Sequence, residues 1–382
     1  MNKNLCIKEE WLDDFFEKVT KKLERTSKEI GAKFPYTTTD GKYEEFAVNN
    51  NVSYWTNGFW PGMMWLMYAH TKDEQYLEIA RKCEDMLDKA IEDFKIHHDV
   101  GFMWILSALA DYVLTGNEKS RTRAMHAATI LAGRFNINGN FIRAWDVYPE
   151  KDCTGWAIID CLLNVPLLYW ASRETNDPRF KAVAKAHTNT VMHHFVKEDF
   201  SVNHIVGFCP ETGVVKEIPR GQGYAPGSAW SRGQSWAVYG FTLGYMNTKD
   251  SAYLSMAKNI ADYVISNLDE SGVPVVDYKA PGDLDARDTT AGAITACGLI
   301  ELSRYAEDGE KYLSAALKMM KGLYENCDFS DSEQSILQNG TEAYHDGRKN
   351  IPIIYGDYYM LEALMKLKGE KFNFWCAGMN EE

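Results

Sequence analysis

No Pro/Gly/Ser-rich linker, charge block or low-complexity segment divides the chain, although its 382 residues exceed the usual size of one domain. We therefore expect a single domain that spans residues 1–382. The chain also lacks any window of about 18 uninterrupted apolar residues, and its start has no apolar region of signal-peptide length. These absences predict a cytoplasmic protein that does not bind membranes.

Positive charge is scarce, because 41 Lys and Arg face 54 Asp and Glu and give a net charge of −13. A nucleic-acid partner needs a basic surface, so this balance argues against one. An acidic small-molecule substrate would have to be held by a few locally placed Arg or Lys side chains. The eight cysteines are scattered without CxxC pairs in a chain too large to need crosslinks, which predicts free thiols.

Sequence motifs for metal ions and for nucleophiles are also missing. His97, His98 and Asp99 are consecutive, but neighbours on a helix diverge by roughly 100°, and no HExxH motif or i, i+4 His pair occurs. The GxSxG pattern of Ser-His-Asp hydrolases is absent as well. We therefore expect neither a metal ion nor an organic cofactor.

Two kinds of helical segment alternate along the chain. Six are amphipathic and charged, as in helices with one solvated face: 8–29, 73–90, 118–135, 178–195, 251–268 and 310–327. Six are apolar on nearly every side, as in buried helices: 57–70, 99–114, 156–172, 229–246, 288–305 and 355–367. This repeat is typical of stacked helical hairpins, and closing it into a ring predicts an all-α (α/α)6 barrel with the apolar helices inside. The β-like segments 201–208 and 272–276 fall in connections.

The starts of the apolar segments share an unusual composition. They read YWTNGFWPG, IHHDVGFMW, CTGWAIID, SAWSRGQSW, ARDTTAG and YGDYY. Nearly all combine a polar or charged group with Trp, Tyr or Gly, and in such a barrel these starts can meet at one end. Helix capping would explain Asp288 and Asp357, but caps do not need indole rings. The 11 Trp of the chain favour a cleft for a carbohydrate or another flat ligand.

One carboxylate, Asp160, lies within the apolar stretch WAIIDCLLNVPLLYW (156–170), which we interpret as one long buried helix. Ionising a carboxyl in such a place costs several kcal/mol unless donors or cations surround it. Asp160 is therefore either paired for structural reasons or kept protonated for proton transfer.

Four motifs together resemble those of a known enzyme family. WTNGFW (55–60), HHDVGF (97–102), the Asp160 stretch and QGYAPGSAWSRGQSW (222–236) are similar, in the same order, to motifs of the unsaturated glucuronyl hydrolases. The resemblance covers about residues 55–359 and implies a bacterial (α/α)6 glycoside hydrolase. Its implied activity is removal of a non-reducing-end 4,5-unsaturated glucuronic acid from lyase-generated fragments of glycosaminoglycans or related glycans, by hydration of the vinyl-ether double bond.

The same resemblance implies roles for individual residues. Asp160 matches the acid/base that protonates C4, and Asp99 matches a second essential aspartate. Arg232 matches a bidentate partner for the substrate carboxylate and Trp236 a platform for the sugar ring. Two further groups of matches concern substrate binding: the polar residues Gln222 and His204, and the wall residues Trp55, Trp145 and His98. A protonated Asp160 is physically reasonable, because an apolar wall and a second carboxylate both raise a carboxyl pKa.

Two departures from the family bear on the substrate. Gly221 occupies a position where some relatives carry a basic or histidine side chain, with Arg220 beside it as a possible substitute. The Ser-x-x-Ser-x-Lys run of relatives that prefer sulfated fragments is absent from HDGRKNIPIIYGD (345–357), although Arg348 and Lys349 could replace it. The sequence leaves the preference for sulfate open.

Three other functions stay open. An unsaturated rhamnogalacturonyl hydrolase would use the same fold and chemistry on pectin fragments. A toroidal sugar epimerase would normally use histidine bases, but no His pair occurs at matching starts of inner helices. A non-catalytic glycan-binding toroid would keep the tryptophans without needing both Asp99 and Asp160. In every case we expect a small-molecule ligand and a monomer or weak homo-oligomer.

Overall fold

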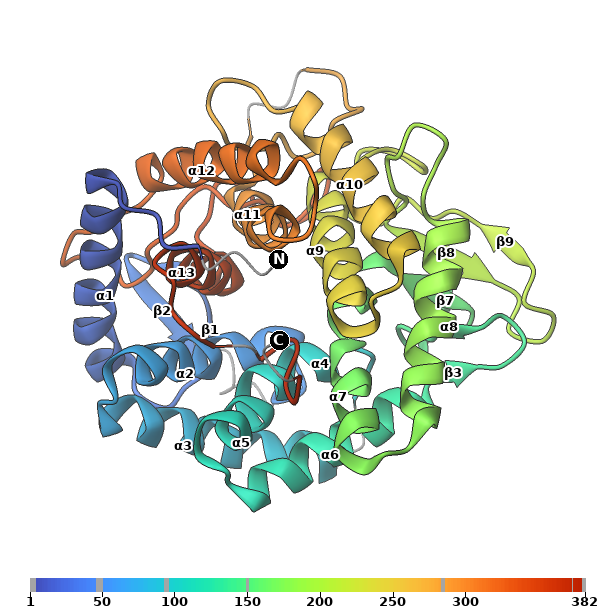
Figure 1. Ribbon diagram of the computed structural model, residues 1–382, viewed down its shortest axis with the longest axis horizontal. Helices are drawn as coiled ribbons and strands as arrows, with labels where there is room; N and C mark the ends of the chain where they lie inside the picture. The colour runs from blue at the N-terminus through green and yellow to red at the C-terminus, as the bar shows by residue number, and fades with distance from the viewer. Residues whose placement is uncertain are drawn as a thin grey trace.

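The computed structural model describes residues 5–45, 51–92, 96–148, 151–282, 286–372 and 374–379, and its helices form two concentric rings (Figure 1). The outer ring consists of α1 (Glu10–Ile30), α3 (Glu74–Glu92), α6 (Glu118–Gly133), α8 (Pro178–His194), α10 (Ser251–Ser266) and α12 (Gly309–Glu325). The inner ring consists of α2 (Phe59–Thr71), α4 (Val100–Trp104) with η3 (Ile105–Leu109) and α5 (Ala110–Thr115), α7 (Pro166–Thr175), α9 (Ser231–Thr248), α11 (Thr289–Ser303) and α13 (Ile354–Leu367). The predicted (α/α)6 barrel is confirmed.

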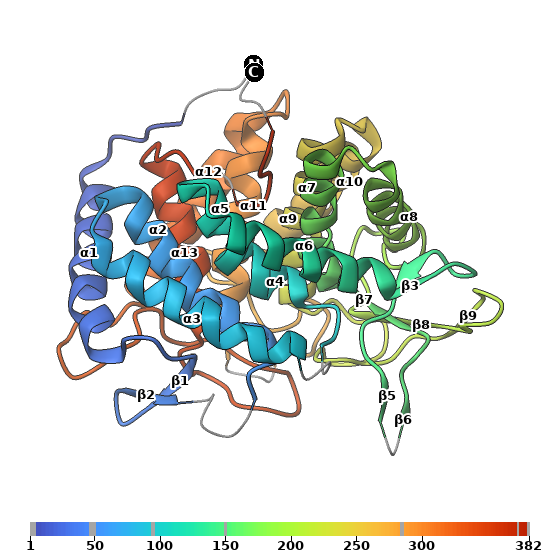
Figure 2. The same ribbon diagram turned by 90° about the horizontal axis from the view of Figure 1, so that it is seen from below.

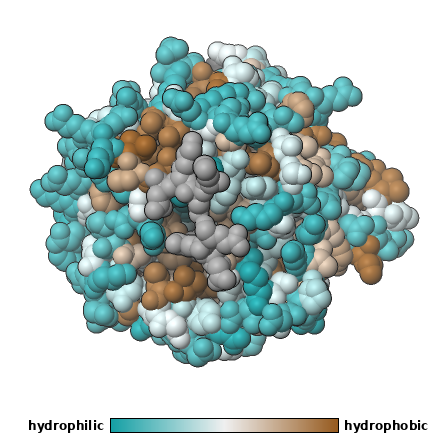
Figure 3. Space-filling model, in the orientation of Figure 1, coloured by the Kyte–Doolittle hydropathy of each residue, from teal (hydrophilic) through white to brown (hydrophobic). Residues whose placement is uncertain are grey.

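Burial explains which helices are inside. Helix α1 buries Leu12, Phe15, Val19 and Leu23, which recur every three to four residues and leave the opposite face to solvent. Helices α11 and α13 are buried along their whole length and have no solvated face. The ring closes because α13 packs against both α11 and α2. Figure 3 shows that the rim formed by the outer helices is mostly hydrophilic.

Short antiparallel strands extend the connections at one end of the ring. Strand β1 (Pro35–Thr39) pairs with β2 (Lys42–Glu45), β3 (Phe135–Asn136) with β4 (Phe141–Ile142), and β5 (Val147–Tyr148) with β6 (Lys151–Asp152). Strands β7 (Trp156–Ile158), β8 (Ile205–Phe208) and β9 (Val215–Glu217) form a three-stranded sheet. In Figure 2 the β1–β2 and β5–β6 hairpins lie at the end opposite the two chain termini. The segment predicted at 201–208 contains β8, whereas 272–276 has only an isolated bridge from Val275 to Arg287.

The segment around Asp160 differs from the predicted long helix. Residues Trp156–Ile158 form strand β7, η4 (Ile159–Leu163) is a 3-10 turn, and helix α7 begins only at Pro166. Aromatic and β-branched residues favour a strand, and Pro166 lacks the backbone N–H that a helix interior requires. Asp160 therefore lies in a turn between strand and helix, and not within a regular helix.

Two other expectations about helix starts need correction. Asp99 precedes helix α4, and the inner helix then passes through the π-helical segment η3, so 99–114 is not one regular α-helix. Asp288 is confirmed as the N-cap of α11, since its carboxylate accepts the Thr290 N–H. Asp357 is not a cap of its own helix. It lies inside α13 and accepts the backbone N–H groups of Ile336 and Leu337.

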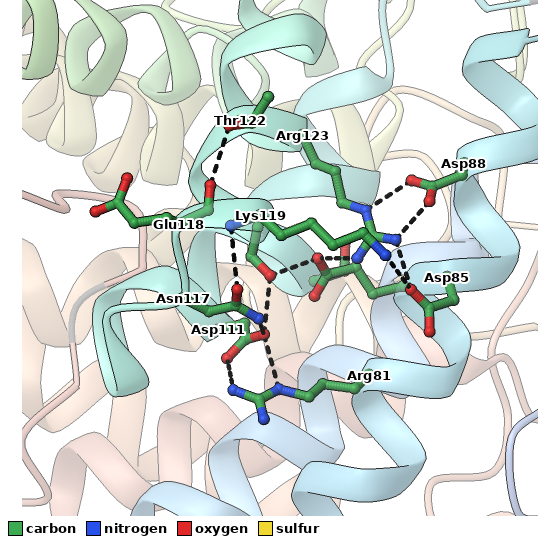
Figure 4. A network of polar contacts seen from close by, with 12 residues as sticks. Arg81, Asp85, Asp88, Asp111, Asn117, Glu118, Lys119, Thr122 and Arg123 are labelled. Atoms are coloured by element: carbon green, nitrogen blue, oxygen red, sulfur yellow. Dashed lines mark hydrogen bonds and ion pairs between the residues drawn. The ribbon is translucent and has the colours of Figure 1, made fainter.

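Ion pairs join helix α3 to its neighbours α5 and α6 (Figure 4). Arg81 of α3 donates to both carboxylate oxygens of Asp111 of α5, at 2.9 and 3.0 Å. Arg123 of α6 pairs with Glu84 and Asp88 of α3. Bidentate, partly buried contacts of this kind have more geometric specificity than exposed pairs, so the first pair fixes α5 against α3 and the second fixes α6 against α3.

The segment that follows α13 closes the end of the ring near the termini. Phe374, Trp375, Cys376 and Ala377 are buried. The Trp375 indole N–H donates to Glu362 at 2.9 Å, and its ring stacks on Tyr359 of α13. The barrel axis is therefore filled by side chains at this end.

The cysteines within the described residues are free thiols, as predicted. A search of the described helices finds none with the length and apolar character needed to cross a membrane.

Candidate active site

A cavity of about 610 Å³ lies at the end of the ring that carries the strands. The predicted residues that line it are Trp55, Asp99, Trp145, Asp160, His204, Gln222, Arg232 and Trp236. They come from six different parts of the chain: the turn before α2, the turn before α4, the β4–β5 connection, the β7–β8 region, the β9–α9 connection and the start of α9. The expectation that Asp99, Asp160, Arg232 and Trp236 face one cavity is confirmed.

Nitrogen atoms of three side chains lie close to the Asp99 carboxylate. Its Oδ2 lies 2.7 Å from His97 Nδ1 and 3.3 Å from His98 Nε2, and its Oδ1 lies 3.4 Å from Asn164 Nδ2. Burial raises the pKa of Asp99, but the two histidines and Asn164 together outweigh it, so the pKa falls below its ordinary value. Asp99 is therefore ionised near neutral pH.

The surroundings of Asp160 shift its pKa in the opposite direction. Its Oδ1 is buried and has no hydrogen-bond partner among the residues that the structure describes. Burial first, and the charge of Asp99 second, raise the pKa of Asp160 well above its ordinary value. The two carboxyl groups thus divide their roles: Asp99 holds the negative charge and Asp160 holds the proton. This division is what a general acid next to a fixed anion requires.

Arg232 is already engaged by the protein. Its guanidinium forms an ion pair with Asp288, donates to the carbonyl oxygens of Thr341 and Glu342, and lies 4.4 Å from the ring centre of Trp230. These contacts hold the long α12–α13 connection against the start of α9. Arg232 nevertheless lines the cavity. Its role as a carboxylate partner stays a prediction, but the structure adds a second role in holding the cavity wall.

His204 and Gln222 form one polar unit. The Gln222 backbone N–H donates to His204 Nδ1 at 3.0 Å, so the ring carries its proton on Nε2. Burial first, and the charge of Arg232 second, lower the pKa of His204 to about 3, so the ring is neutral at pH 7. The Gln222 side chain donates to the Glu342 carbonyl at 2.7 Å.

The departure at Gly221 has a structural reason. Gly221 has a φ of +63°, and a Cβ atom there would lie 2.1 Å from His204 Nδ1. A side chain at this position would displace the histidine, so this chain cannot place a basic group there without rebuilding the site.

Two predicted residues lie at the margin of the cavity. His98 is fully buried behind Asp99, and burial lowers its pKa to about 4, so it supports Asp99 rather than forming a wall. Arg220 forms an ion pair with the lining residue Asp346 at the exposed rim. Neither side chain is positioned as an inner substrate contact.

Several lining residues were not predicted: Tyr36, Tyr54, His97, Trp230, Glu342 and Tyr355. Sequence signals existed for four of them, because Tyr54, His97, Trp230 and Tyr355 belong to the helix-start motifs quoted above. Tyr36 and Glu342 come from connections without such a pattern. Their side chains meet across the mouth, where the Tyr36 hydroxyl donates to Glu342 at 2.6 Å.

The cluster of His97, His98 and Asp99 converges, contrary to the argument from helical divergence, because these residues precede α4. The potential ligand atoms lie within 4.8 Å of one another. The 2.7 Å contact between His97 Nδ1 and Asp99 Oδ2 is a direct hydrogen bond, which accounts for the cluster by itself. Among the described residues this is the group that comes nearest to a metal site, and it is better explained as the support of a carboxylate.

Comparisons with known proteins agree with this geometry. The model of Glycosyl Hydrolase Family 88 matches residues 26–369. The chain is 34% identical over 361 residues to the unsaturated glucuronyl hydrolase of Bacillus sp. strain GL1, which covers 92% of this chain and 95% of that protein. It is 33% identical over 385 residues to the unsaturated chondroitin disaccharide hydrolase of Streptococcus pyogenes serotype M1, covering 96% of this chain and 95% of that protein.

The fold is similar to solved structures over nearly its whole length. The crystal structure of the Bacillus sp. GL1 enzyme superimposes with a TM-score of 0.90 at 32% identity, covering 96% of this chain and 100% of that one. The unsaturated glucuronyl hydrolase of Streptococcus agalactiae gives a TM-score of 0.88 at 31% identity, covering 97% and 94%. With the family model, these matches show that the chain belongs to glycoside hydrolase family 88.

Proposed function

We propose that this glycoside hydrolase removes a non-reducing-end 4,5-unsaturated glucuronic acid from short oligosaccharides by hydrating the double bond of the sugar. The relatives named above support this, since they are called unsaturated glucuronyl and unsaturated chondroitin disaccharide hydrolases. One structure of the Streptococcus agalactiae enzyme is described as a complex with dGlcA-GalNAc6S. The proposal includes the identity of the glycan that is attached to the uronate.

The observation that carries the proposal is the pair of aspartates with opposite pKa shifts in one cavity. Asp160 transfers its proton to C4 of the C4=C5 enol ether. The positive charge then develops at C5, where the ring oxygen shares it, and the ionised Asp99 stabilises it electrostatically. Water adds its oxygen to C5, and the Asp160 carboxylate takes the released proton.

The product of this addition breaks down without further catalysis. C5 now carries a hydroxyl and the ring oxygen, so the hemiketal opens to a ketone and leaves a hydroxyl on C1. C1 then bears both this hydroxyl and the glycosidic oxygen, and this hemiacetal releases the neighbouring sugar as an alcohol. One water molecule is consumed and Asp160 ends in its starting protonation state, so no cofactor enters the reaction.

Substrate placement follows from the remaining lining residues. The net charge of −13 repels a uronate at long range, so its binding must rest on short, desolvated contacts. Arg232 is the lining cation that faces Asp160. Trp236 and Trp55 provide flat apolar surfaces for the sugar ring. His204 and Gln222 supply neutral hydrogen-bonding groups for its hydroxyls.

We also propose that the whole chain is one catalytic unit that acts as a monomer or weak homo-oligomer. Support comes from the convergence of site residues from 36 to 355 on one cavity within a single copy. Light scattering during gel filtration measures the mass in solution.

Incubation with an unsaturated chondroitin disaccharide tests the activity. We expect the ultraviolet absorbance of the enoate to disappear and a free amino sugar to form in equal amount. An unsaturated galacturonyl-rhamnose serves as the matched comparison. Turnover of the pectin fragment alone would overturn the proposed substrate class, and turnover of neither would overturn the proposed activity.

A further inference from the structure

Asn164 is a fully buried side chain that contacts the segments of both catalytic aspartates and is not among the residues that line the cavity. It follows directly on η4, the turn that carries Asp160. Its Nδ2 lies 3.4 Å from Asp99 Oδ1 and 3.4 Å from the Asp160 carbonyl oxygen. Its Oδ1 accepts the Phe102 backbone N–H at 2.9 Å. One amide thus contacts both catalytic segments.

We propose that Asn164 is a positioning residue that fixes the Asp99 carboxylate and fastens the segment carrying Asp99 to the turn carrying Asp160. The inference deepens the proposed function, because it concerns how the same two aspartates keep their separate roles. Asn164 contacts neither the cavity nor the substrate path, so it acts through Asp99.

The surrounding contacts leave the amide a single orientation. The Phe102 N–H can be accepted only by an oxygen, so Oδ1 must face helix α4 and Nδ2 must face Asp99. The backbone of Gly101 packs directly on Asn164, and a Cβ atom on that glycine would lie 2.4 Å from Asn164 Cα and 2.5 Å from its Oδ1. The donor therefore reaches Asp99 with little freedom to move away.

Asn164 also differs chemically from the other groups around Asp99. The titratable or charged groups that face this carboxylate are His97 and His98 on its own segment, Asp160 and Cys161 on η4, and Arg134 after α6. The Asn164 amide keeps its hydrogens at every pH at which the enzyme folds, so its contact with Asp99 Oδ1 is constant.

Loss of this donor has a directional effect on the pH profile. Without it, the protonated form of Asp99 becomes relatively more favourable, so the acidic limb of kcat moves to higher pH. The alkaline limb stays in place, because Asp160 then loses its proton beside an Asp99 that is already ionised. A residue that merely packs would lower kcat and leave both limbs where they were.

Two variants test this on the unsaturated chondroitin disaccharide. Asn164→Ala removes the donor, and Asn164→Leu removes it at nearly the same side-chain volume without adding a charge. We expect both to lower kcat on the order of tenfold and to raise the acidic limb by about one pH unit, with little change in KM. Asn247→Ala is the matched control, since Asn247 is a buried amide that bonds Arg173 and the Trp375 carbonyl at the closed end of the ring.

The control should leave both limbs unchanged even where it lowers stability. Wild-type limb positions in both Asn164 variants would overturn the proposal, and so would a parallel shift of the two limbs. A second measurement does not need turnover: the NMR titration of ¹³Cγ-labelled aspartate, assigned with Asp99→Asn, should show a higher Asp99 pKa in Asn164→Leu than in the parent. An unchanged titration would refute the positioning role of Asn164. Failure of the parent to act on the disaccharide would refute only the proposed function.

Discussion

Replacing Asp160 by Asn is the most direct test of the chemistry. The amide is isosteric and cannot donate an acidic proton, so substrate binding should survive while protonation of C4 fails. A general acid typically contributes 10²–10⁴-fold to a rate. The surroundings of Asp160 place this case at the upper end, because the neighbouring groups cannot take over its task.

Each neighbour of Asp160 lacks a suitable proton. Asp99 is ionised, since its pKa lies below the ordinary value. His98 and His204 have pKa values of about 4 and about 3, so both rings are neutral at pH 7. We therefore expect kcat of Asp160→Asn to fall by about 10⁴-fold, equivalent to roughly 5 kcal/mol of transition-state stabilisation.

The assay follows enoate absorbance with the unsaturated chondroitin disaccharide, and equilibrium binding is measured separately. Asp331→Asn is the matched control, because this carboxylate is 95% exposed, and it should retain the parent's kcat. An Asp160→Asn variant that keeps more than a tenth of the activity would refute the assignment of Asp160 as the acid.

Asp160→Asn should also change the way in which the stability of the protein depends on pH. The pKa of Asp160 is raised in the folded chain, so above its ordinary value of 3.8 the unfolded chain releases a proton that the folded chain retains. The parent therefore loses stability as pH rises from 3.8 towards the folded pKa, whereas the Asn variant does not. The Tm of the variant should equal that of the parent near pH 3 and exceed it at pH 7. A lower variant Tm at pH 7 would contradict the raised pKa.

Four further substitutions have expected outcomes. Asp99→Asn should reduce kcat and move the alkaline limb of the residual activity to lower pH, because the charge that helps to raise the Asp160 pKa is gone; a fixed limb would argue against coupling. Arg232→Lys should lower kcat/KM on the order of 10²-fold despite keeping its charge, since one ammonium cannot replace the contacts of the fork; a loss within threefold would refute this. Gly221→Ala should raise KM and destabilise the fold by about 1–3 kcal/mol in urea unfolding, because its φ is +63°; unchanged values would show that the loop adapts. Trp375→Ala should lower the free energy of unfolding by about 3–5 kcal/mol in the same assay, and a loss below 1 kcal/mol would show that the packing of Trp375 is dispensable.

The helical architecture was predictable because burial of a helix requires apolar residues at regular spacings in the sequence. The alternation of one-sided and all-round apolar segments identified the outer helices, and the inner helices other than α7, to within a few residues. The same logic failed at 156–172, because a short buried strand and a buried helix are both continuously apolar. Pro166 was the signal that the helix begins there, and the β-branched and aromatic residues before it favoured the strand.

The family resemblance predicted Trp145, His204 and Gln222, which line the cavity although they lie outside the helix-start motifs. Other site residues were predictable because they belong to those motifs. Asp99, Asp160 and Trp236 were found in this way, and the structure brings them to one cavity. The partner of Arg232 was not foreseen, because Asp288 lies 56 residues away and had been interpreted only as a cap. Glu342 lies in a connection whose conformation depends on Arg232 and Gln222. Such long-range contacts leave no local pattern in a single sequence.

The filled end of the barrel determines how molecules must pass through the enzyme. Trp375 and Tyr359 occupy the axis beneath the cavity floor, where Tyr359 also touches Trp236, so the described residues leave substrate and product the same opening. A glycan that enters this opening presents its end to Asp160, as removal of a terminal sugar requires. After each turnover the detached sugar has to back out before the next tip arrives, so the protein cannot thread a polymer and trim it in successive steps. Shortening therefore depends on another enzyme to create each new unsaturated end.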